Sequence, residues 1–155
     1  MRGTRKRNAK ANRRDKAIRR LIIVDIENYT RKPVLTQQDV AAARISLIED
    51  LGIGNDDMVI VGTSHPSNYV NAQLAWKGPR HVGKWGHDGA DKALIEAFDQ
   101  YDLDTYSKVY VISGDGIFTD VVKRIRAKNC PVNVVAPRGA INYRLYRAAE
   151  AVDMV

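Results

Sequence analysis

The chain has 155 residues, of which 45% are hydrophobic, and one cysteine, Cys130. This length accommodates one domain with a buried core and is too short for two. A single cysteine excludes an intramolecular disulfide and a cysteine-rich metal site, and no apolar run approaches the roughly 18 residues of a membrane span. These features predict a cytoplasmic protein that acts away from membranes in a reducing compartment.

The net charge of +7 is unevenly distributed along the chain. Residues 1–20 contain ten Lys or Arg and one acid, which gives +9, whereas the remainder contains fifteen Lys or Arg and seventeen acids, which gives −2. The first segment has almost nothing apolar to bury, so we expect residues 1–20 to form a disordered arm that contacts nucleic-acid phosphates. A solubilising or targeting extension is the alternative interpretation.

The first predicted strand covers residues 21–24, a continuous apolar run that stops at Asp25. The next element is a helix, because Thr36 with Asp39 three residues later forms a typical helix start. An apolar face then continues until Gly52, a residue that commonly ends helices.

A second strand is predicted at residues 58–61, where another apolar run ends at a glycine. A helix at 65–76 follows from its position more than from its pattern, and 80–84 is a weaker strand candidate. Apolar residues at helical spacing then predict a helix over 90–101, and residues 109–112 form a third clear apolar strand.

The last predicted elements are a helix at 118–125, a strand at 132–136 and a closing helix at 141–152. Uninterrupted apolar strands alternating with helices indicate a mostly parallel sheet covered on both faces. We therefore predict a Rossmann-like α/β sandwich of three layers with about five strands, formed by residues 21–155.

Three acids are predicted to share one edge of this sheet. Asp25 directly follows the first strand, Asp115 follows the strand at 109–112, and Asp91 opens a helix. Ligand sites of open α/β sheets lie beyond the carboxyl ends of the strands, and in the order 3-2-1-4-5 the strands of Asp25 and Asp115 are neighbours at the switch point. Converging carboxylates repel one another unless a cation such as Mg²⁺ or Mn²⁺ neutralises them. Helix capping is the alternative role of Asp115, and helix-dipole stabilisation that of Asp91.

Three short motifs resemble those of NYN domains, which are PIN-like nucleases. Asp25-Ile26-Glu27-Asn28 resembles the family's D-x-x-N motif after the first strand. Gly89-Ala90-Asp91-Lys92-Ala93-Leu94 is similar to its G-x-D-x-x-L motif, and Ser113-Gly114-Asp115-Gly116-Ile117-Phe118 is similar to its S-G-D-x-D-F signature. The resemblance covers roughly residues 21–136, with all three motifs in order.

This resemblance implies a ribonuclease whose carboxylates hold Mg²⁺ or Mn²⁺ and hydrolyse RNA phosphodiester bonds. Asp25, Asp91 and Asp115 would be the metal-binding acids, and Asn28 would orient a ligand or phosphate. The chain departs from the signature at Ile117, where a second aspartate is usual. Asp120 is a candidate for the missing charge, and a solvated acid in the first turn of a helix is its other interpretation.

Candidate RNA contacts are the basic residues of the arm and the basic or aromatic residues that the predicted fold leaves outside the core. They are Arg5, Lys6, Arg7, Arg13, Arg14, Arg19, Arg20, Arg31, Lys32, Trp85, Arg144 and Arg147. Trp85 stands among glycine and polar residues, so it either stacks on a base or packs as a lid over the core.

The leading hypothesis is therefore a metal-dependent endoribonuclease that binds RNA and no membrane. An RNA-binding module that keeps the fold without catalysis is the alternative, and Ile117 favours it. A phosphatase of the haloacid dehalogenase type is a third candidate, but it requires a second aspartate where this chain has Glu27. Nothing in the sequence demands an oligomer.

Overall fold

The structure is a computed structural model that describes residues 19–155. Its strands are, in chain order, β1 (Arg20–Asp25), β2 (Met58–Thr63), β3 (Arg80–Gly83), β4 (Lys108–Ile112), β5 (Val132–Ala136) and β6 (Ala151–Met154). Its α-helices are α2 (Ile26–Thr30), α3 (Gln37–Leu51), α4 (Pro66–Ala75), α5 (Gly89–Phe98), α6 (Thr119–Ala127) and α7 (Tyr143–Ala148). Two 3₁₀ turns, η1 (Leu103–Thr105) and η2 (Gly116–Phe118), precede β4 and α6. None of the helices in this described range is long and apolar enough to cross a bilayer.

Within residues 19–155 the strands form one six-stranded sheet in the order β3-β2-β1-β4-β5-β6, and every neighbouring pair is parallel. The predicted α/β sandwich is confirmed, with six strands in place of about five. The order reverses at β1, since the chain adds β2 and β3 on one side and β4 to β6 on the other. This reversal places the switch point between β1 and β4.

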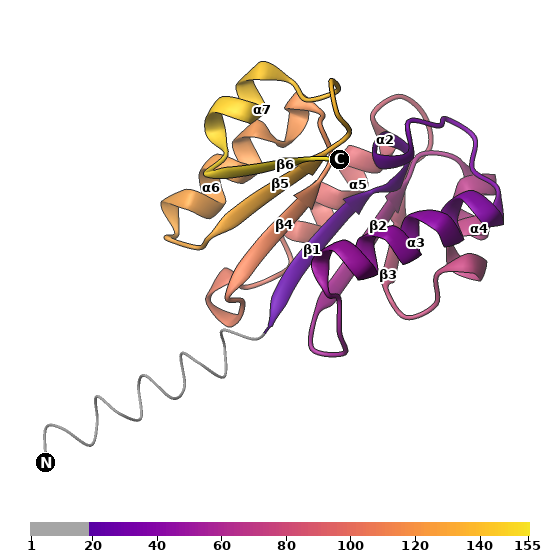
Figure 1. Ribbon diagram of the computed structural model, residues 1–155, viewed down its shortest axis with the longest axis horizontal. Coiled ribbons are helices and arrows are strands. Elements are labelled where there is room, and N and C mark those ends of the chain that lie inside the picture. The colour runs from indigo at the N-terminus through magenta and orange to yellow at the C-terminus, as the bar shows by residue number, and fades with distance from the viewer. Residues whose placement is uncertain (1–18) are drawn as a thin grey trace, which may run out of the picture.

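Helices cover both faces of the sheet, as Figure 1 shows. Alternate residues of β1 supply the two faces, because successive side chains of a strand point in opposite directions. Leu21 and Ile23 pack with α5, α6 and α7, whereas Ile22 and Val24 pack with α2, α3 and α4. Burial on both sides explains why these strands are continuously apolar.

Local signals in the sequence account for the start and end of α3. Thr36 Oγ1 accepts a hydrogen bond from Asp39 N at 3.1 Å, and Asp39 Oδ2 accepts one from Thr36 N at 2.9 Å. The helix ends at Gly52, whose φ of 61° lies in the left-handed region. This capping box and C-terminal glycine confirm the helix expected from Thr36.

The predicted closing helix over residues 141–152 is wrong. Helix α7 covers only Tyr143–Ala148, Ala149 is extended, and β6 pairs in parallel with β5. The apolar residues at helical spacing are satisfied in part by α7, where Leu145 is buried. Backbone hydrogen bonding along the free edge of β5 then favours a sixth strand over more helix.

Candidate metal centre

The predicted acids lie at the carboxyl edge of the sheet. Asp25 ends β1, Asp115 follows β4, and Asp91 lies in the first turn of α5. Leu21 and Ile23 of β1 face α5 and α6, so the strand pleat turns Asp25 toward the same side. Since β1 and β4 are neighbours, these acids meet at the switch point of the sheet.

Asp25 is only 4% exposed and has a fixed orientation. Its Oδ1 accepts a hydrogen bond from Asn28 N at 3.3 Å, and its Oδ2 accepts one from Ser113 Oγ at 3.1 Å. Burial raises the pKa of Asp25, and hydrogen bonds with Asp91, Asn28 and Ser113 offset this rise in part. These hydrogen bonds therefore hold the Asp25 carboxyl group in contact with that of Asp91.

Asp91 lies between Asp25 and Asp115 and is also 4% exposed. Burial, together with the hydrogen bonds and negative charges of Asp25 and Asp115, raises the pKa of Asp91 to about 10. Carboxylate oxygens of Asp91 and Asp115 lie within 4.8 Å of one another, a separation at which two unit charges repel by about 3 kcal/mol at an effective dielectric constant of 20. Bringing these groups together therefore requires a positive charge, either a proton or a metal cation.

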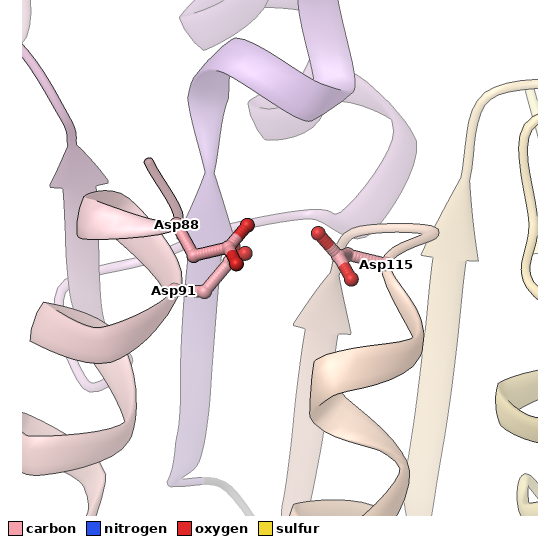
Figure 2. A group of neighbouring side chains, drawn as sticks. All are labelled: Asp88, Asp91 and Asp115. Carbon is pink, nitrogen blue, oxygen red and sulfur yellow. The ribbon is translucent and has the colours of Figure 1, made fainter. Parts of the chain in front are cut away.

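Asp88 completes the cluster, although no sequence motif singled it out. Carboxylate oxygens of Asp88, Asp91 and Asp115 lie within 4.8 Å of one another, and Figure 2 shows the first two reaching from the start of α5 and the third from the loop after β4. Asp88 precedes α5 with a left-handed φ of 56° and makes no side-chain capping bond. Aspartate adopts this backbone conformation more readily than most residues. Its side chain is 35% exposed, so the centre is open to solvent on this side.

The loop that carries Asp115 is fixed from two directions. Asn28 Oδ1 accepts a hydrogen bond from Gly114 N at 2.9 Å, and Ser113 Oγ accepts one from Asp115 N at 3.1 Å. A Cβ at position 114 would overlap the backbone of Ala140, so this close approach requires glycine. Asn28 Oδ1 thus positions the loop of Asp115 relative to β1.

The structure also shows the positions of Ile117, which replaces the second aspartate of the family signature, and of Asp120, the candidate for its missing charge. Ile117 packs against the hydrophobic core, and its N–H donates to Asp115 Oδ1 at 3.0 Å. Asp120 is exposed and is not part of the cluster of Asp88, Asp91 and Asp115. Besides Asp25, the acid that joins Asp91 and Asp115 therefore comes from the loop before α5 and not from α6.

Some of the predicted RNA contacts border the same edge of the sheet. Arg31 and Lys32 follow α2, and Lys32 forms an ion pair with the start of α3. Arg144 and Arg147 are exposed on α7, as expected from their positions off its apolar stripe. Trp85 lies in the connection before α5, is 56% exposed and belongs to neither core cluster, which does not support a lid over the core.

Other predicted contacts lie far from this edge. Arg20 begins β1 at the amino edge, where its guanidinium donates to both carboxylate oxygens of Asp57, at 2.9 and 2.7 Å, and to Leu51 O at 2.8 Å. Arg19 lies over the ring of Tyr106, 5.4 Å from its centroid. The remaining candidates, Arg5, Lys6, Arg7, Arg13 and Arg14, fall outside the described residues.

An open parallel α/β sheet with carboxylates gathered at its switch point fits a nuclease-like, PIN-like fold. The family model for the NYN domain matches residues 69–154, more than half of the chain, so the chain belongs to the NYN domain family. The matched range contains Asp88, Asp91 and Asp115, whereas Asp25 lies before it.

The fold recurs in a solved structure of low sequence identity. The chain is similar to a crystal structure of a protein of unknown function from Vibrio parahaemolyticus, with 16% identity and a TM-score of 0.52. The similarity covers 88% of this chain and 92% of that one. At this identity the similarity supports the fold alone. A comparison with curated proteins finds no match.

Proposed function

We propose that the chain is a metal-dependent ribonuclease that hydrolyses internal phosphodiester bonds of RNA. The observation that carries this proposal is the position of Asp91, which is buried between Asp25 and Asp115 with its pKa raised to about 10. A buried acid surrounded by other acids weakens the fold and is therefore unusual unless it serves a site. Membership of the NYN family supplies the reaction class.

The donor set fits a hard divalent cation. Asp88, Asp91 and Asp115 offer carboxylate oxygens within 4.8 Å of one another, and oxygen ligands are those that Mg²⁺ and Mn²⁺ prefer. Asp25 adjoins Asp91, and we propose that it holds Asp91 in place through the hydrogen bond between their carboxyl groups. When bound, the cation supplies an activated water and stabilises the charge that develops on the phosphate.

The remaining parts of the edge are proposed to hold this arrangement together and to receive RNA. Asn28 fixes the loop of Asp115, and Ser113 fixes Asp25. Exposed basic side chains around the edge, such as Arg31 and Arg144, can pair with phosphates that approach an otherwise acidic centre.

Cleavage of labelled RNA in Mn²⁺ tests the proposal, with wild type compared with Asp91→Asn and with Asp120→Asn as a matched control. We expect wild type and Asp120→Asn to cut RNA and Asp91→Asn to lose activity, because Asp91 belongs to the acidic centre and Asp120 does not. EDTA should abolish cleavage. Activity that persists in EDTA, or equal activity in Asp91→Asn, would show a different mechanism or a contaminant.

A binding module without catalysis is the second candidate, and Ile117 is the observation that favours it. This position lacks the acid of the family signature, and its side chain packs on the core. Binding of RNA without cleavage by the wild type in Mn²⁺ would favour the module. Changing Ile117→Asp is then a poor rescue, since it would place a charge at a partly buried position that packs against apolar side chains.

A further inference from the structure

The connection between β3 and α5 carries an exposed aromatic residue, Trp85, as well as the acid Asp88. Backbone hydrogen bonds fix this connection: Lys84 N to Thr63 O at 3.3 Å, Gly86 N to Ser64 O at 3.2 Å and Gly89 N to Gly86 O at 3.0 Å. They tie it to the end of β2 and close it into a turn. Trp85 is therefore held at the same edge of the sheet as the acidic centre.

The indole of Trp85 is supported on two sides and open elsewhere. Its ring lies over Gly83, where a Cβ would come within 2.9 Å of it, and it meets the ring of Tyr69 edge to face with centroids 5.9 Å apart. Trp85 is nonetheless 56% exposed, whereas Trp76 is 3% exposed. A large aromatic surface that is positioned but not buried is the arrangement that proteins use to stack on single-stranded nucleic acid.

Trp85 is also close to the acids along the chain. Asp88 is the third residue after Trp85, so their Cα atoms are at most about 11 Å apart. The nucleotide next to a phosphate held at the acidic centre can cover this distance. The neighbouring Lys84 and His87 are exposed, Lys84 pairs with Glu96, and His87 Nε2 lies 3.2 Å from Asp88 Oδ2.

We propose that Trp85, supported by Tyr69, is a stacking subsite for an unpaired base beside the reacting phosphate, so that the substrate class is single-stranded RNA. The position of the phosphate rests on the proposed function above. A base inside a duplex is stacked on both faces and cannot lie on an indole, which excludes paired RNA from this subsite. Stacking alone reads no particular sequence, because every base has an aromatic face.

Binding of a short labelled single-stranded RNA in EDTA tests this subsite without requiring cleavage. Trp85→Ala should weaken binding by about 5-fold to about 150-fold, the range for loss of one stacked base. Trp85→Phe should retain most of the affinity, since it keeps an aromatic face. Leu74→Ala is the matched control, because Leu74 is 53% exposed on α4 and belongs to neither core cluster.

Intrinsic fluorescence provides a second readout. The chain has two tryptophans, so RNA should quench the emission of the exposed Trp85, and this quenching should be absent in Trp85→Phe. Unchanged affinity in Trp85→Ala, or tighter binding of the same RNA as a duplex, would overturn the subsite. If Trp85 contributes to binding but wild type never cuts RNA, the subsite stands and the nuclease proposal fails. If cleavage depends on Asp91 but not on Trp85, only the subsite fails.

Discussion

The substitution Asp91→Asn should stabilise the metal-free protein while it removes activity. In the fold the pKa of Asp91 is raised to about 10, whereas in an unfolded chain an aspartate has a pKa of about 3.9. At neutral pH the folded state therefore binds a proton that the unfolded state releases. Stability consequently falls as pH rises from about 4 to about 10.

The size of this effect depends little on how far the pKa of Asp91 lies above neutrality. The free energy of unfolding is lowered by about 1.4 kcal/mol for each pH unit above 3.9, which amounts to about 4 kcal/mol at pH 7. An asparagine cannot ionise, and its amide can donate to Asp25 and Asp115 as the proton does. We therefore expect Asp91→Asn to raise the free energy of unfolding by about 2–4 kcal/mol at pH 7 and by almost nothing near pH 4.

Urea unfolding followed by circular dichroism, in EDTA and at several pH values between about 4 and about 8, measures this difference. Asp120→Asn should follow the wild type at every pH, because Asp120 is exposed and outside the cluster. Mn²⁺ should stabilise the wild type, since the ion binds only the folded state. The difference in free energy of unfolding between Asp91→Asn and the wild type should therefore become smaller. A less stable Asp91→Asn, or one whose stability varies with pH as in the wild type, would refute the reasoning.

Two further predictions concern the surroundings of Asp91, and a third concerns the basic arm. Asp88→Asn should weaken Mn²⁺ binding by at least about tenfold, measured by the metal dependence of the melting temperature, whereas Asp120→Asn should leave it unchanged. Asn28→Ala should cost about 1–3 kcal/mol in urea unfolding and reduce RNA cleavage, because it leaves Gly114 N without its acceptor; an unaltered protein would mean that the loop needs no such support. Deleting residues 1–18, which contain eight Lys or Arg, should weaken RNA binding and reduce its salt slope by about 0.7 for each cation that contacts a phosphate, and an unchanged slope would exclude the arm from the contact.

Much of the fold could be predicted because its signals are local. Apolar runs such as residues 21–24 are continuous since both faces of the sheet are covered, and Thr36 with Asp39 marks a helix start by direct hydrogen bonds between them. By contrast, the strand β6 depends on pairing with β5, which no local pattern records. The segment contains alanines, which favour helix, so the helix predicted from the apolar spacing was longer than α7.

The acidic centre was predicted in part for the same reason. Asp25 and Asp115 follow apolar strands, so their common edge could be deduced from the parallel sheet. Asp88 lies in a loop without periodicity, and its side chain enters the cluster through a left-handed backbone that the sequence does not display. One signal was present: Asp88 stands three residues before Asp91, the spacing of about one helical turn.

The all-parallel sheet also determines at which end of the described chain a tag or fusion protein is best placed. The described chain enters β1 at the amino edge beside Arg19, and it leaves β6 at the carboxyl edge, where Val155 N donates to Ala136 O at 2.9 Å. An affinity tag or fluorescent protein fused after Val155 would start at the edge that holds Asp91, and there it could obstruct a polymer approaching the acids. Attachment ahead of residue 19 starts from the opposite edge, which makes it the better choice for surface immobilisation and for tagged assays.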